Sequence, residues 1–148
     1  TGGEAVPTVR VDAGMLDEAH RNLITTSAGR VDAVSLGTPH YSVTEMRRLG
    51  EMLSGKSCRV PLFVSTSREV LGALDSSEVE SLEAAGVQVV TDTCTYITPI
   101  LDPSARLVMT DSVKWAYYAP ANLGVVVAFG SMAACVEAAL AGETTSPW

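Results

Sequence analysis

Short, continuously apolar runs recur along the chain, and each one leads directly into polar residues. Four such runs cover residues 33–36, 62–64, 87–90 and 107–109, and residues 125–128 are a possible fifth. Runs of this length without polar alternation are typical of strands that are buried on both faces. Because helical patterns separate them, the sequence predicts an α/β fold of three layers, with a mainly parallel sheet of four to five strands between helices.

Signals for helices lie between the apolar runs. Ser42 and Glu45 form a capping box, in which the two side chains satisfy free amide groups at the start of a helix. Apolar residues at helical spacing follow, and Gly55 ends this helix. Further helices are predicted from Asp12 to Gly29, from 67 to Gly86 in two segments of which Ser77 and Glu80 mark the second, and from 131 to Gly142.

Composition narrows the class of protein. The chain has 148 residues, of which 47% are hydrophobic, and this is enough for one domain core. The formal net charge is −7, so the chain lacks the positive field of a general nucleic-acid binder. No apolar run approaches the length of a membrane-spanning helix. The sequence therefore predicts a globular domain that binds neither nucleic acid nor membrane.

The expected organisation is a single α/β domain over residues 1–148, with loose ends at 1–10 and 143–148. The chain begins without Met and shows no signal peptide. Three cysteines without a CxxC pair are typical of a reducing compartment. We therefore expect a cytoplasmic protein, and we expect the chain to be a piece of a longer one.

The polar clusters that follow four of the apolar runs are expected to meet. They occupy residues 37–40, 65–68, 92–95 and 110–112. In an open parallel sheet the carboxyl ends of the strands lie at one edge, and ligands bind in the crevice beyond them. Polar loops and helix caps are the alternative explanation for any one cluster. Four clusters at one edge favour a binding site.

Several polar residues have more than one interpretation. His40 is a candidate proton shuttle, ligand or loop-ordering residue. Arg68 is placed to bind a carboxylate with two hydrogen bonds, or is a surface charge. Asp111 and Lys114 lie one helical turn apart, which is also the spacing of an ion pair. His20, near the apolar face of the first predicted helix, is expected to be structural.

The three cysteines differ in their sequence surroundings. Cys58 lies in a linker and is interpreted as incidental, whereas Cys135 falls on the apolar face of a predicted helix and is expected in the core. Cys94 lies among hydroxyl residues at the end of a strand, without apolar neighbours in sequence. It is the strongest chemical candidate, either as a nucleophile with His40 as its base or as a metal ligand. Dinucleotide-binding, P-loop, nucleophile-elbow and zinc-protease motifs do not occur in the sequence.

Six segments form an ordered set along the chain. They are SLGTPHYS at 35–42, VSTSR at 64–68, VTDTCTYITP at 90–99, TDSVKWAYYAP at 110–120, NLGV at 122–125 and VAFGS at 127–131. Together they resemble the catalytic, large-subunit portion of the aconitase X family, and the similarity extends from about Val11 to Gly142. The resemblance implies an α/β fold like that of the aconitase iron–sulfur domains. It also implies an iron–sulfur hydro-lyase, a dehydratase of a small hydroxy acid such as cis-3-hydroxy-L-proline or mevalonate 5-phosphate.

The same resemblance implies a site. A 2Fe–2S or 4Fe–4S cluster is held by three cysteines and leaves one iron open as a Lewis acid for the substrate hydroxyl. Cys94, and with it Cys135, match cysteines that hold this metal cluster. The residues that match substrate-binding positions are Thr38, His40, Ser67, Arg68, Thr95, Ser112 and Lys114.

Two parts of the complete family enzymes are expected outside this chain. These are an N-terminal part and a small swivelling domain or subunit, which by analogy with aconitases provides the catalytic serine base. No catalytic residue is therefore expected in the chain itself, and the isolated domain is expected to bind a cluster poorly and to be inactive. Asp111 and Tyr117 stand where the family pattern has Asn and His. The alternative function is a non-catalytic α/β interaction module without a cofactor.

Overall fold

A five-stranded parallel sheet forms the centre of the computed structural model, which describes residues 6–26 and 28–144. Its strands lie in the order β4-β3-β2-β5-β6, and every neighbouring pair is parallel. This confirms the predicted α/β fold, and each of the apolar runs coincides with a strand or overlaps one. The strands are β2 (Ala33–Tyr41), β3 (Leu62–Thr66), β4 (Val87–Thr91), β5 (Leu107–Thr110) and β6 (Val126–Phe129).

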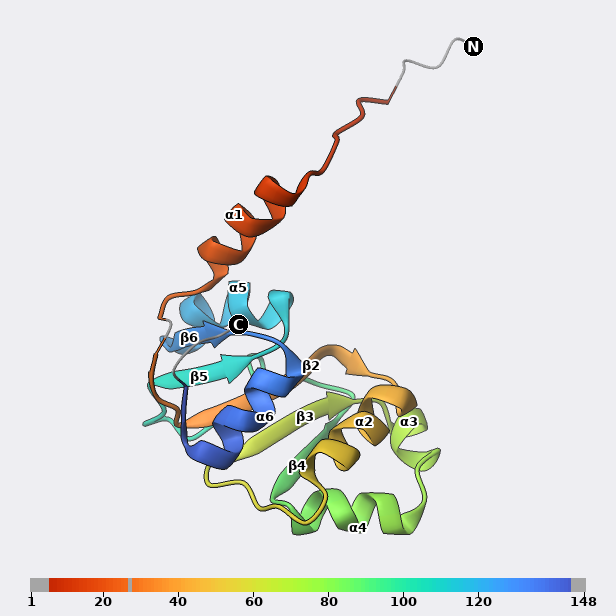
Figure 1. Cartoon of the computed structure of the whole chain (residues 1–148). Helices are drawn as coiled ribbons and strands as arrows, with labels where there is room; N and C mark the ends of the chain where they lie inside the picture. The colour runs from red at the N-terminus through yellow and green to blue at the C-terminus, as the bar shows by residue number, and fades with distance from the viewer. Residues whose placement is uncertain (1–5, 27, 145–148) are drawn as a thin grey trace.

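Helices cover both faces of the sheet (Figure 1). On one face, α2 (Val43–Leu53) packs between α4 (Ser76–Ala84) and α6 (Met132–Ala141), and on the other face α5 (Val113–Leu123) packs against β6, β2 and β5. Successive strand residues divide between two core clusters. Val34 and Met109 belong to the cluster under α2 and α6, whereas Ala33 and Val108 belong to the cluster that contains Trp115 of α5. Burial of alternate residues on both sides explains why the strands are mostly apolar and lack a regular apolar–polar alternation.

A two-stranded antiparallel sheet pairs β1 (Gly29–Arg30) with β7 (Glu143–Thr144). This pairing differs from the expectation that residues 143–148 are a loose end, and residues 145–148 lie outside the described residues. At the other end, residues 6–10 form neither helix nor strand, and residues 1–5 lie outside the description. The following helix, α1 (Ala13–Leu23), extends away from the body of the domain (Figure 1).

Helices α2 and α4 each begin directly after a residue that forms a capping box. The predicted capping box is confirmed at α2, where the Glu45 N–H donates to Ser42 Oγ over 3.3 Å and the Ser42 N–H donates to Glu45 Oε2 over 2.8 Å. The next helical region forms two segments as predicted, but the residues predicted to mark the start of the second segment were wrong. The two segments are α3 (Arg68–Gly72) and α4. Glu78, rather than Glu80, caps the start of α4, since its side chain accepts from the Asp75 N–H over 2.8 Å.

The sequence pattern did not predict α5. Pro120 lies inside this helix and removes one backbone donor, a feature that normally argues against a helix. The helix forms because Ser112 caps its start and Gly124, in the left-handed conformation at φ 68°, ends it. Its buried Trp115, Ala116 and Ala119 then anchor it to the sheet.

No helix in the part of the chain that the structure describes is long and apolar enough to cross a membrane. The cytoplasmic location stays a prediction.

Candidate functional site

The strand order of the sheet changes direction between β2 and β5. From β2 the chain adds β3 and then β4 on one side, whereas β5 and β6 lie on the other side of β2. The segments that leave β2 and β5 therefore run to different faces, into α2 and α5 respectively. In open α/β sheets a crevice opens at such a switch point, and ligands bind there.

An open cleft of about 820 Å³ lies at this point. It combines the end of β2, the start of α2 and the β5–α5 junction. The cleft brings together four residues of the predicted substrate-binding set: Thr38, His40, Ser112 and Lys114. The other residues of its lining are Gly37, Pro39, Tyr41, Glu45, Asp111, Val113, Tyr117 and Tyr118.

Hydrogen bonds join the two walls of the cleft. Asp111 Oδ1 accepts from the Gly37 N–H over 3.3 Å, and Asp111 Oδ2 accepts from the Tyr41 hydroxyl. The Ser112 hydroxyl donates to the Thr38 carbonyl. Asp111 thus bonds to the β2 wall and not to Lys114, and the two segments that carry the candidate residues are fixed relative to each other.

The Asp111–Tyr41 contact lies in a poorly solvated environment. Burial raises the pKa of Asp111, while the hydrogen bonds from Tyr41 and Gly37 act in the opposite direction. Burial also raises the pKa of Tyr41, and the neighbouring Asp111 carboxylate raises it further. Tyr41 therefore remains a neutral donor, which is the role that its bond to Asp111 requires.

The N-terminus of α5 opens onto the cleft. Ser112 Oγ accepts from the Trp115 N–H over 3.1 Å, which satisfies one donor of the first turn. Among the described residues, no hydrogen bond engages the backbone N–H of Val113 or Lys114. Free N–H groups at a helix start, beside a lysine ammonium group, attract carboxylates and phosphates. The hydroxyl of Thr38, buried in the same lining, also finds no hydrogen-bond partner within residues 6–26 and 28–144.

Ser67 and Arg68 lie outside this cleft lining. Ser67 caps α3, since its Oγ accepts from the Val70 N–H over 3.1 Å. Arg68 forms an ion pair with Asp92 through its Nε, and its backbone N–H donates to Asp92 Oδ1 over 3.1 Å. These two contacts lower the pKa of Asp92, the backbone bond most strongly. The Arg68 guanidinium group is exposed and already has a carboxylate partner.

Thr95 has a structural set of contacts. It is fully buried, its Oγ1 lies 2.6 Å from Ser35 Oγ, and it accepts from Trp115 Nε1 over 2.8 Å. These bonds connect the loop after β4, strand β2 and helix α5. A smaller pocket of about 280 Å³ also includes Thr95 in its lining, but none of the cleft residues.

The cleft lining also includes residues outside the predicted substrate-binding set. Tyr117 and Tyr118 follow Lys114 by three and four positions, so one face of α5 carries all three side chains into the lining. A helix prediction for this segment would have found them. Tyr41 and Glu45 join the lining because β2 extends to residue 41 and α2 begins two residues later.

The two predicted cysteine ligands lie in different core clusters. Cys94 is 8% exposed and packs in the cluster of Phe63 and Trp115, so apolar residues from other elements surround it although its neighbours in sequence are hydroxyl residues. Cys135 is fully buried in the cluster on the other face, as its helical position predicted, and burial raises its pKa. Cys58 is half-buried.

This placement does not fit a three-cysteine cluster site within the chain. Among residues 6–26 and 28–144, no group of three His, Cys, Asp or Glu side chains is arranged to hold a metal ion. The ligand role of Cys94 and Cys135 stays a prediction. A Cys94–His40 catalytic pair is also not formed in the part described, since His40 lines the cleft and Cys94 packs in a core cluster.

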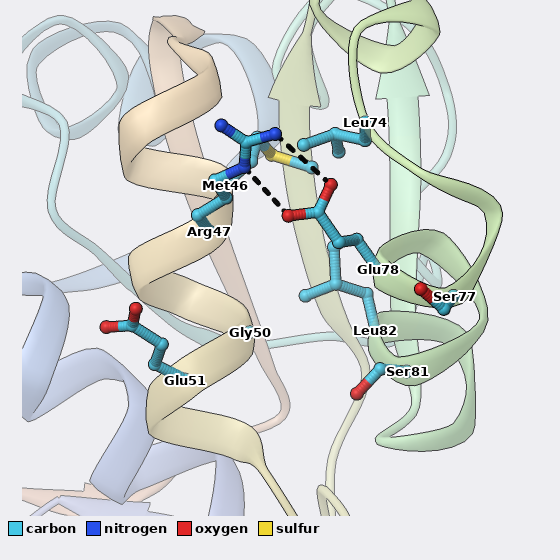
Figure 2. A pocket seen from close by; sticks show the side chains of 9 residues that line it. All are labelled: Met46, Arg47, Gly50, Glu51, Leu74, Ser77, Glu78, Ser81 and Leu82. Carbon is cyan, nitrogen blue, oxygen red and sulfur yellow. Dashed lines mark hydrogen bonds and ion pairs between the residues drawn. The ribbon is translucent and has the colours of Figure 1, made fainter.

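A second pocket, of about 290 Å³, lies between α2 and α4 (Figure 2). The Arg47 guanidinium group meets the Glu78 carboxylate across it, with Nε 2.7 Å from Oε1. Its other lining residues are Met46, Gly50, Glu51, Leu74, Ser77, Ser81 and Leu82. None of these belongs to the predicted site set, and the pocket is separate from the carboxyl-end loops of β2 and β5.

Comparison with known proteins identifies the fold and the family. Residues 31–141 match the family model described as Aconitase X third domain. The chain belongs to the aconitase X family. The match confirms the resemblance of the ordered segments, and it covers both walls of the cleft.

Curated relatives of this aconitase X domain are dehydratases. The chain is 37% identical over 142 residues to a cis-3-hydroxy-L-proline dehydratase of Pseudomonas aeruginosa, covering 93% of this chain and 24% of that protein. It is 36% identical over 123 residues to a phosphomevalonate dehydratase large subunit of Methanothermobacter thermautotrophicus, covering 82% of this chain and 31% of that protein. The chain therefore spans about a quarter to a third of the length of these relatives.

A solved structure has the same architecture. The crystal structure of Thermococcus kodakaraensis aconitase X in its holo-form matches with a TM-score of 0.77 and 25% sequence identity. The match covers 92% of this chain and 35% of that one.

Proposed function

We propose that this aconitase X domain is part of a hydro-lyase that removes water from a small hydroxy acid, and that the cleft between β2 and β5 binds an anionic group of the substrate. The observation that carries the proposal is the convergence of Thr38, His40, Ser112 and Lys114 at the switch point of the sheet. The dehydratase names of the relatives support the reaction type. The candidate substrates are cis-3-hydroxy-L-proline and mevalonate 5-phosphate, which both carry a carboxylate.

The residues of the chain supply binding and orientation. The Lys114 ammonium group and the start of α5 neutralise a carboxylate or phosphate, which holds the carbon skeleton in place. His40, on the opposite wall, is available to hold or transfer a proton. Asp111 and Ser112 keep these walls together. We assign the base that removes the carbon-bound proton to a small swivelling domain or subunit outside this chain.

An iron–sulfur cluster is part of the proposal only for the complete enzyme. Cys94 and Cys135 lie in separate core clusters, so the residues of this chain do not by themselves form a site for such a cluster. Iron and sulfide analysis of the complete protein tests each cysteine separately. Loss of bound iron in Cys94→Ala or Cys135→Ala supports a ligand role for that residue, and unchanged iron content rejects it.

A non-catalytic α/β module is the second candidate function. The placement of Cys94 and Cys135 in different core clusters favours this module, or a different set of cluster ligands in the complete enzyme. This alternative predicts a complete protein that neither binds iron nor eliminates water from hydroxy acids.

The direct test uses the complete protein with any separately encoded small subunit, reconstituted anaerobically with iron and sulfide. Dehydration of cis-3-hydroxy-L-proline or mevalonate 5-phosphate, followed by NMR of the product, supports the proposal. Failure on both substrates by a folded, iron-replete protein contradicts it. The 148-residue chain alone is expected to be inactive, and turnover by it would contradict the assignment of the base to another part.

A further inference from the structure

Helix α1 carries an apolar stripe that the domain covers only at one end. Met15, Leu16, Ala19 and Leu23 lie within one arc of the helix, whereas Asp17, Glu18 and Arg21 lie on the other side. Leu23, at the end of the helix, packs against the core cluster under α5. Met15 and Leu16, near its start, are 45% and 62% exposed, and α1 has no buried residue.

The end of α1 is fixed to the body of the domain. The His20 ring lies 4.9 Å from the Phe129 ring of β6, and the Thr25 N–H donates to the Val127 carbonyl over 3.0 Å. From this anchor the helix extends outward, and its start lies well clear of the sheet and the other helices (Figure 1). The apolar stripe therefore continues beyond the surface that this domain can cover.

The chain before the helix is also apolar and exposed. Val6, Val9 and Val11 are 85%, 73% and 62% exposed. An isolated helix of 11 residues is marginally stable in water, and most helices of this length gain their stability from packing of the apolar face. A surface of this kind is typical of an interface.

Helix α1 lies outside the matched third domain. The match to the third domain begins at residue 31, after α1, so α1 precedes that domain in the chain. The match to the Pseudomonas aeruginosa relative covers 93% of this chain but only 24% of the relative's length. Most of that relative therefore lies outside the matched region, and a third domain implies further domains in the same family of proteins.

We propose that the apolar stripe of α1, with Val9 and Val11, docks into an apolar groove of the domain that precedes this one in the same polypeptide. Helix α1 is then a connecting element, fixed to the third domain at Leu23 and Thr25 and to the preceding domain at Met15 and Leu16. The proposal rests on the proposed function only in taking the chain as part of a longer aconitase X protein. It requires no catalytic activity.

Hydrogen–deuterium exchange tests the docking. The amides of α1 are measured in the 148-residue chain and in the complete protein, with peptides from β3 as an internal reference for folding. Exchange in α1 is expected to be at least about tenfold slower in the complete protein, because a covered helix opens less often. Equal exchange in the two forms would overturn the proposal.

Variants on the two sides of α1 test whether its apolar stripe forms the contact with the preceding domain. In the complete protein, Leu16→Asp is expected to abolish the protection of α1, whereas Leu16→Met and the opposite-face control Glu18→Gln are expected to keep it. Equal protection in Leu16→Asp contradicts the proposed contact. Protection of α1 in the 148-residue chain alone, together with a dimer in sedimentation, would assign the surface to a second copy and overturn the proposal. Hydrogen exchange is measured without turnover, so its result does not depend on the outcome of the activity assay for the proposed function.

Discussion

Gly37 occupies a backbone conformation at the cleft that no other residue can take without displacement. Its φ is +75°, and a Cβ atom there would lie 2.5 Å from the Ser65 carbonyl oxygen. Its N–H also donates to Asp111. The same residue therefore permits the close approach of β2 and β3 and bonds one wall of the cleft to the other.

Alanine substitutions at Gly37 and Gly124 separate two costs to the stability of the fold, the steric clash of an added Cβ atom and the strain of a left-handed backbone. Gly124 has a similar φ of +68°, but no atom within 4 Å of an added Cβ. Gly124→Ala is expected to lower the free energy of unfolding by about 1 kcal/mol, the cost of a left-handed alanine. Gly37→Ala is expected to lower it by about 3 kcal/mol, because the clash is added. Urea denaturation of both variants measures the difference, and equal losses would show that the close approach is absent.

Asp32 supplies the clearest dependence on pH. Its carboxylate accepts from the Arg106 and Leu107 N–H groups over 2.8 and 3.0 Å, and these bonds lower its pKa. A lowered folded-state pKa gives stability that is present above the unfolded value of about 3.9 and lost as the pH falls through the folded value. Asp32→Asn is expected to reduce the free energy of unfolding at pH 7 by about 1 kcal/mol.

The difference between wild type and Asp32→Asn is expected to shrink as the pH falls below about 4, because the wild-type carboxyl group then takes up a proton. Denaturation curves at several pH values measure it. A difference that stays constant down to pH 2 would mean that the carboxylate charge contributes nothing to these bonds.

At the scale of the elements, α5 depends on Ser112 for two different contacts. The Ser112 side chain caps the helix at Trp115 and donates to the Thr38 carbonyl across the cleft. Ser131 is a matched control, since its side chain caps α6 at Ala134 over 3.2 Å and forms no such bond across the cleft.

Ser131→Ala is therefore expected to lower the free energy of unfolding by about 1 kcal/mol, the usual value of an N-cap. Ser112→Ala is expected to cost about 2 kcal/mol, because a buried carbonyl also loses its donor. Thermal unfolding of the two variants provides the comparison. A smaller loss for Ser112→Ala than for Ser131→Ala would show that the bond to Thr38 is unimportant.

The elements that could be predicted from sequence are those with a local cause. The strands are mostly apolar because helices cover both faces of the sheet, and the capping box of α2 is a contact between residues three apart. Helix α5 was missed because Pro120 contradicts its local pattern, and its stability comes from Trp115 in a distant core cluster. The pairing of β1 with β7 depends on residues more than a hundred positions apart, which no local pattern shows.

At the scale of the whole molecule, the site was predicted in part. The polar ends of β2 and β5 meet because these strands are neighbours, and the order of the sheet makes their junction the switch point. The ends of β3 and β4 lead to the Arg68–Asp92 ion pair and the buried Thr95 instead. Strand order is a long-range property that a local pattern does not contain. The sequence therefore predicted that four polar clusters meet at one edge, whereas in the structure the clusters that follow β2 and β5 line the cleft.

The proposed anion site predicts that the substrate binds at Lys114 and not at Arg68. The most direct measurement is the KM for the dehydrated substrate in the complete protein, compared between Lys114→Met and Arg68→Met. Loss of a charged hydrogen bond predicts a KM about tenfold or more higher in Lys114→Met. Arg68→Met is expected to change KM little, because its guanidinium group pairs with Asp92 outside the cleft. An unchanged KM in Lys114→Met, with an increase in Arg68→Met, would contradict the account.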